Sequence, residues 1–106
     1  MPNLFKYAIV VLCLTTPAIA THAQSKAGEA AFDELLKCRD RYPDTLPSTM
    51  FWRCAKDVLA RSKIEPRRVN EAIALGDYVV DLHLKGQSTE KQLNKQLADI
   101  LAKATD

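Results

Sequence analysis

Two cysteines, Cys38 and Cys54, are the residues of this chain whose chemistry is most definite. A pair of thiols can form a redox centre, a metal site or a disulfide. The C-x-x-C spacing that tunes thiol reactivity is missing, and His83 is the only histidine beyond the apolar N-terminal segment, so a zinc site within one chain lacks ligands. We therefore predict a structural Cys38–Cys54 disulfide, with a bridge to a partner chain as the alternative, and neither a metal nor a cofactor.

His83 is the one visible candidate for a general base. Two acids precede it, Asp81 by two positions and Asp77 by six, whereas side chains that meet on a helix lie three or four positions apart. Catalysis needs a nucleophile, a base and oxyanion donors that converge, and the scattered glycines do not form a phosphate-binding loop. We predict that the protein is not an enzyme and has no catalytic residues.

Positive charge is concentrated between residues 37 and 68, where nine lysines and arginines stand against four acids. Such a segment can attract an acidic protein or an anionic membrane surface. Alternatively, its basic side chains are simply solvated at the ends of helices. The aromatic residues that single-stranded nucleic-acid binders place between bases are missing, so no nucleic-acid partner is expected.

Three large apolar residues in a row, Met50, Phe51 and Trp52, cannot all face one core. An exposed aromatic side chain beside a basic one is a reasonable binding anchor, although packing of the indole against a neighbouring helix is an equal alternative. The candidate binding surface consists of Trp52, Arg53, Lys56, Arg67 and Arg68.

The N-terminal segment has the three parts of a secretory signal peptide. Lys6 supplies the positive charge, residues 7–14 are apolar, and small residues favour cleavage after Ala20 or after Ala23. The apolar run is shorter than the roughly 20 residues that span a bilayer. We predict a cleaved signal peptide over residues 1–23, a single domain over residues 24–106, and a periplasmic or secreted location.

Apolar residues in the predicted domain recur at helical spacing, and no alternating strand pattern is present. The third of the predicted helices, residues 66–84, is apolar around most of its circumference in its second half, which indicates a central helix packed on several sides. Within it, Gly76 would allow a neighbouring backbone to come close. The fold class predicted is all-α, a small four-helix bundle whose first two helices are joined by the disulfide, with helices near residues 25–42, 50–62, 66–84 and 89–104.

These features favour a small exported protein that binds another protein. The classes expected are an accessory factor of an envelope secretion or conjugation machine and an immunity or inhibitor protein. The partner would be an envelope protein, with an acidic surface if the basic segment takes part. The alternative is a cationic helical protein that acts on membranes, as a toxin or surface binder.

Overall fold

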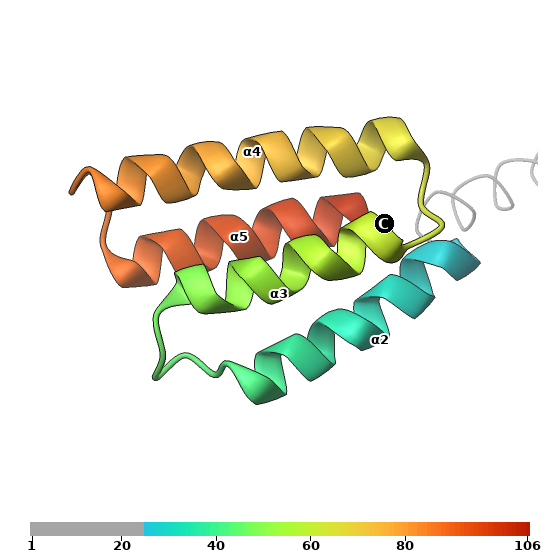
Figure 1. The fold of residues 1–106 in the computed structure, drawn as a ribbon, viewed down its shortest axis with the longest axis horizontal. Coiled ribbons are helices and arrows are strands. Elements are labelled where there is room, and N and C mark those ends of the chain that lie inside the picture. Colours follow the sequence, from blue (N-terminus) through green and yellow to red (C-terminus); the bar gives the residue numbers. More distant parts are fainter. Residues whose placement is uncertain (1–24) are drawn as a thin grey trace, which may run out of the picture.

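The computed structural model describes residues 25–106, and the predicted signal peptide over residues 1–23 lies outside them. The described chain is an all-α bundle (Figure 1), as predicted. Its helices are α2 (Lys26–Arg41), α3 (Ser48–Arg61), α4 (Pro66–Leu84) and α5 (Glu90–Ala104). Among these residues, no helix combines the length and apolar composition needed to cross a bilayer.

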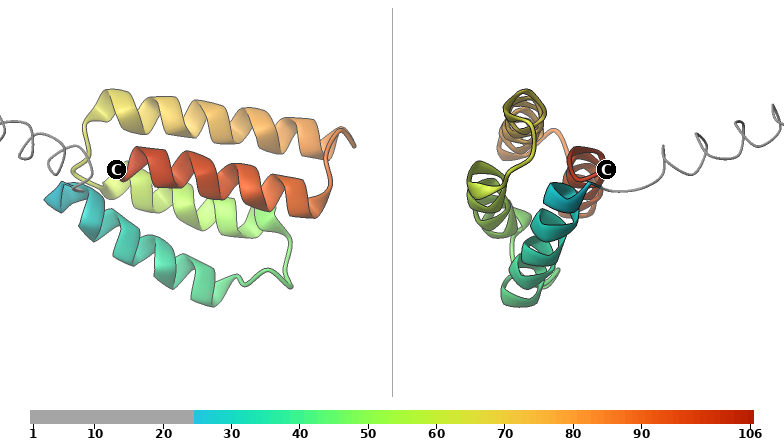
Figure 2. Two further views of the ribbon diagram at one scale, coloured as in Figure 1. Left: turned by 180° about the vertical axis from the view of Figure 1, so that it is seen from behind. Right: turned by 90° about the vertical axis from the view of Figure 1, so that its right-hand side faces the viewer.

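Successive helices run in opposite directions, so the bundle has two distinct ends (Figures 1 and 2). At one end lie the α2–α3 and α4–α5 connections, residues 42–47 and 85–89, which we call the loop end. At the other end α2 and α4 begin and α3 and α5 finish. We call it the basic end, after Lys26, Arg61, Lys63, Arg67 and Arg68.

The central helix is α3, because it packs against each of the other three helices. The prediction that α4 is central is wrong. Leu75 and Tyr78 on α4 are 53% and 60% exposed, and only one face of that helix is buried. Apolar residues around most of the circumference of α4 therefore do not mean that other helices enclose it.

Most helix boundaries follow from local sequence signals. The Ser25 hydroxyl accepts a hydrogen bond from the Gly28 backbone N–H and so caps α2. Thr89 and Gln92 form a reciprocal capping box at the start of α5. Gly86 adopts a positive φ of 81° just after α4, the left-handed conformation that glycine adopts most readily.

Trp52 of α3 is the largest side chain of the core and is only 2% exposed. Its indole ring lies against Gly76 of α4, where an added Cβ would collide with ring atoms Cζ2 and Cη2. The indole Nε1–H donates a 2.9 Å hydrogen bond to Asp77. The close neighbour of Gly76 is thus a side chain and not the backbone we predicted.

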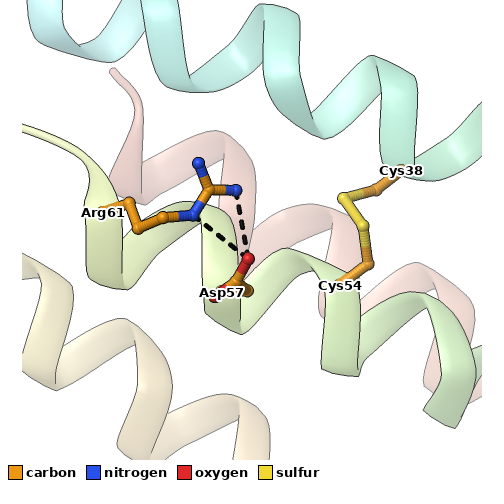
Figure 3. Close-up of a disulfide and its surroundings, with 4 residues drawn as sticks. All are labelled: Cys38, Cys54, Asp57 and Arg61. Atoms are coloured by element: carbon orange, nitrogen blue, oxygen red, sulfur yellow. Dashed lines mark hydrogen bonds and ion pairs between the residues drawn. A yellow bond between two sulfur atoms is a disulfide. The ribbon is translucent and has the colours of Figure 1, made fainter.

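The predicted disulfide is present between α2 and α3 (Figure 3). The Cα atoms of Cys38 and Cys54 are 5.8 Å apart, within the range that a disulfide spans. In the chain-entropy model, a loop of this size contributes about 3 kcal/mol to stability. The bridge therefore supplies a large share of the stability of so small a domain.

Candidate functional site: a groove at the basic end

The predicted binding surface does not form a single surface. Trp52 is buried, so of the two alternatives the packing of its indole against a neighbouring helix is confirmed and the exposed anchor is wrong. The reason is complementary packing: Gly76 leaves space for the ring and Asp77 accepts its N–H. A large apolar residue with both an apolar cleft and a hydrogen-bond partner gains more from burial than from exposure.

Two of the predicted basic residues hold the fold together. Lys56 donates a 2.9 Å hydrogen bond to Asp77 and so links α3 to α4. Arg68 donates to the carbonyl oxygens of Lys103 at 2.7 Å and Asp106 at 3.2 Å, and thereby satisfies acceptors at the end of α5. Arg53 and Arg67 are exposed, and these two remain available to a partner.

The basic segment itself is divided between the two ends of the bundle. Because α2 and α3 are antiparallel, residues 37–41 lie at the loop end, whereas residues 61–68 lie at the basic end (Figure 1). Lys26, which is outside the segment, joins the second group. The three-dimensional charge pattern is therefore not the one that a count along the sequence indicates.

A groove runs between α2 and α3 at the basic end. Its floor is apolar and made of small residues, since Ala31 and Val58 are buried there and Ala27 is half-buried. Polar and charged side chains surround this floor. The full lining is Lys26, Ala27, Ala30, Ala31, Glu34, Val58, Arg61, Ser62 and Lys63.

The charged rim of the groove is mainly positive. Arg61 pairs with Asp57 at 3.1 Å (Figure 3), and Glu34 pairs with Lys37 at 3.1 Å. Both pairs are exposed, and exposed ion pairs contribute little to the free energy of folding. Lys26 and Lys63 form no ion pair with any residue between 25 and 106. The N-terminus of α2 adds the positive end of a helix dipole to the same region.

A second groove lies between α4 and α5, and its charges are mixed. Leu75 and Ile100 supply apolar surface, and both acidic and basic side chains line the groove beside them. Arg68 on this edge is already bound to the end of α5. The full lining is Arg68, Glu71, Ala72, Leu75, Asp99, Ile100, Ala102, Lys103, Ala104 and Asp106.

At the loop end, His83 belongs to a cluster of contacts between helices. Its Nδ1 lies 2.9 Å from the Ser88 carbonyl oxygen and its Nε2 lies 3.2 Å from Glu90 Oε1. The other Glu90 oxygen accepts a hydrogen bond from the backbone N–H of Ser48, the first residue of α3. The hydrogen bonds from Ser48, together with the nearby imidazole, lower the pKa of Glu90.

The sequence does not reveal this cluster, because Ser48 is distant from His83 and Glu90 along the chain. In the structure Pro47 occupies the cap position without a side-chain hydrogen bond, and Glu90 of α5 accepts from the helix instead. The Ser48 side chain is buried. The arrangement joins α3, α4 and α5, which is a structural task.

Arg39 makes a second set of contacts at the loop end. Its guanidinium donates to Asp44 at 2.7 Å and to Asn94 of α5 at 2.8 Å, and it lies 3.9 Å from the centre of the Phe51 ring.

Across residues 25–106, no group of three or more His, Cys, Asp or Glu side chains converges as metal ligands would.

Comparisons of the chain with protein-family models, with curated proteins and with solved structures found no match.

Proposed function

We propose that the protein is a small exported binding protein without catalytic activity, and that it contacts a partner protein through the basic end. The observation that carries this proposal is the groove between α2 and α3, whose apolar floor is bordered by Lys26 and Lys63. Neither lysine forms an ion pair with another described residue. Charged side chains with no structural task beside apolar surface are typical of the rim of a binding site.

The location and the class of partner come from the sequence. The signal peptide predicted over residues 1–23 would place the protein in the periplasm or outside the cell, and a disulfide suits such a compartment. There the protein would serve as an accessory factor of a secretion or conjugation machine, or as an immunity or inhibitor protein. Its partner would be an envelope protein with an acidic surface.

The test is site-specific photo-crosslinking in the living cell. A photoreactive amino acid replaces Lys63 at the basic end or, as the matched control, Lys91, which is exposed at the loop end. The proposal expects one defined protein to be crosslinked from position 63 and not from position 91. Equal crosslinking from both positions, or none from position 63, would refute it.

The second candidate function is binding to anionic membranes. The exposed bases of the basic end support it, together with the exposed apolar side chains of Leu75 and Tyr78 on α4. Sedimentation with vesicles that contain phosphatidylglycerol separates the two functions. A membrane-binding protein would sediment with the vesicles at low salt and much less at high salt, whereas a protein-binding module would stay in the supernatant.

A further inference from the structure

The floor of the α2–α3 groove is suited to close approach by a helix. On α2 it is formed by Ala27, Ala30 and Ala31, whose side chains end at Cβ. Val58 of α3 completes this floor and is buried. Helices whose contact residues are small can pack at the short end of the usual range of interaxial distances.

The long walls of the groove are the helices α2 and α3, whose peptide groups bond within the helix, and only Ser62 and Lys63 of its lining lie outside them, with no sheet edge among the described residues. Addition of a strand to a sheet edge is therefore excluded as a recognition mode at this site. The mode that remains for a peptide is a helix whose apolar face lies in the groove.

The rim determines the charge of that helix. Lys26, Arg61 and Lys63 border the groove, and Glu34 is the only acid among its lining residues. Glu34 is already paired with Lys37, whereas Lys26 and Lys63 have no acidic partner among residues 25–106. A helix with carboxylates beside its apolar face would complement this rim.

We infer that the α2–α3 groove receives an amphipathic helix of the partner protein, with an apolar face of small and medium side chains flanked by Glu and Asp. The inference rests on the proposed function and names the chemistry of the partner. Lys26 and Lys63 act on the flanking carboxylates, and Ala30 lies against the apolar face of the incoming helix.

A second copy of this chain is the competing occupant. The outer face of α4 presents Leu75 and Tyr78 beside Glu71, so it has some of the required chemistry. Such a contact would join two different surfaces and would build rings or open chains rather than closed dimers. Val69, Ala72 and Gly76 of α4 are already buried within its own bundle, so α4 can present only its outer face to the groove of another copy, and a separate helix is the better fit.

The probe is a fluorescent helical peptide of about 18 residues, with Ala and Leu on one face and Glu on the other, and a control peptide in which Lys replaces every Glu. Each is titrated with the disulfide-bonded domain and followed by fluorescence anisotropy. We expect the acidic peptide to bind, with affinity that falls as salt rises, and the basic peptide not to bind. Equal binding of the two peptides would overturn the inference.

Variants of the domain locate the binding. The double variant Lys26→Glu/Lys63→Glu should lower the affinity for the acidic peptide by about tenfold or more, and Ala30→Trp should fill the groove and have a similar effect. The matched control is Lys91→Glu/Lys95→Glu, which changes the charge equally on α5 and should leave the affinity unchanged. An unchanged affinity in Lys26→Glu/Lys63→Glu, with the fold confirmed by circular dichroism, would contradict the inference.

Two further outcomes separate the alternatives. Association of the domain with itself that rises with concentration and disappears in Lys26→Glu/Lys63→Glu would assign the groove to a second copy and overturn the inference. Failure of the acidic peptide, while a protein is still crosslinked from position 63, would refute the helix in the groove but leave the proposed function standing. Failure of both experiments would remove both.

Discussion

The two ends of the bundle contain the same kinds of charged residues but use them differently. At the loop end, Arg39 is bound by Asp44 and Asn94, and Glu90 is bound by Ser48 and His83. At the basic end, Lys26, Lys63 and Arg67 make no ion pair with any described residue. The net charge of a segment therefore does not tell which of its residues are available to a partner.

The cause of this difference lies in how the helix termini are satisfied. At the basic end, Ser25 caps α2, Pro66 begins α4 without an N–H to satisfy, and Arg68 binds the carbonyls at the end of α5. At the loop end, α3 has no cap of its own and depends on Glu90 from another helix. The helix ends at the basic end therefore engage only Arg68 among the basic side chains, whereas α3 at the loop end engages Glu90 from α5.

The largest effect is expected from the disulfide, which lies in the half of α2 that leads to the loop end. Replacing both Cys38 and Cys54 by Ala should lower the free energy of unfolding by about 3 kcal/mol, because the unfolded chain regains the freedom that the bridge removes. Urea unfolding followed by circular dichroism measures this change. Two free thiols in protein taken from its native compartment would contradict the bridge.

The contact between Trp52 and Gly76 lies in the middle of the bundle and serves neither end. Gly76→Ala should cost about 1–3 kcal/mol, because the new methyl group overlaps the indole ring and forces the helices apart. Asn70→Ala, on the exposed surface of the same helix, is the control and should change stability by less than about 0.5 kcal/mol. Similar stabilities of the two variants would show that the ring can move aside freely.

Glu90 allows the loop end to be tested with pH. Glu90→Gln should cost about 1 kcal/mol at neutral pH, because α3 loses a charged acceptor for its first N–H. The pKa of Glu90 is lower in the folded than in the unfolded protein, so its stabilisation is present above the ordinary carboxyl pKa near 4.5 and is lost as the pH falls through the folded value.

The stability gap between the natural protein and Glu90→Gln should therefore be constant near neutral pH and shrink in acid. Asp77, whose pKa is lowered by hydrogen bonds from Trp52 and Lys56, should show the same sign in Asp77→Asn. Thermal unfolding recorded from pH 7 down to pH 3 checks both variants. A stability gap that widens in acid would contradict the conclusion that these carboxylates stabilise the fold in their ionised form.

Much of the fold could be predicted from the sequence because its signals are local. Helical spacing of the apolar residues located the helices, and their ends carry local signals such as the Ser25 and Thr89 caps and Gly86. The disulfide followed from two cysteines on the first two predicted helices, with neither C-x-x-C spacing nor further metal ligands. Each of these inferences needs only neighbouring residues or one simple geometric step.

The parts that could not be predicted depend on contacts between residues distant in the chain. The fit of the Trp52 ring against Gly76 decides that Trp52 is buried, and the apolar pattern of α4 does not reveal that Tyr78 and Leu75 stay exposed. The groove likewise joins Lys26 to Lys63. Only the packing of α2 against α3 places these two lysines on one site.

The central claim is that Arg39, Asp44 and Glu90 at the loop end hold the helices, while Lys26, Lys63 and Arg67 at the basic end are left for a partner. The most direct test compares the unfolding free energies of two triple variants, Arg39→Gln/Asp44→Asn/Glu90→Gln and Lys26→Gln/Lys63→Gln/Arg67→Gln. We expect the loop-end variant to lose about 2 kcal/mol and the basic-end variant to change by less than about 0.5 kcal/mol. Equal losses in the two variants would contradict the account.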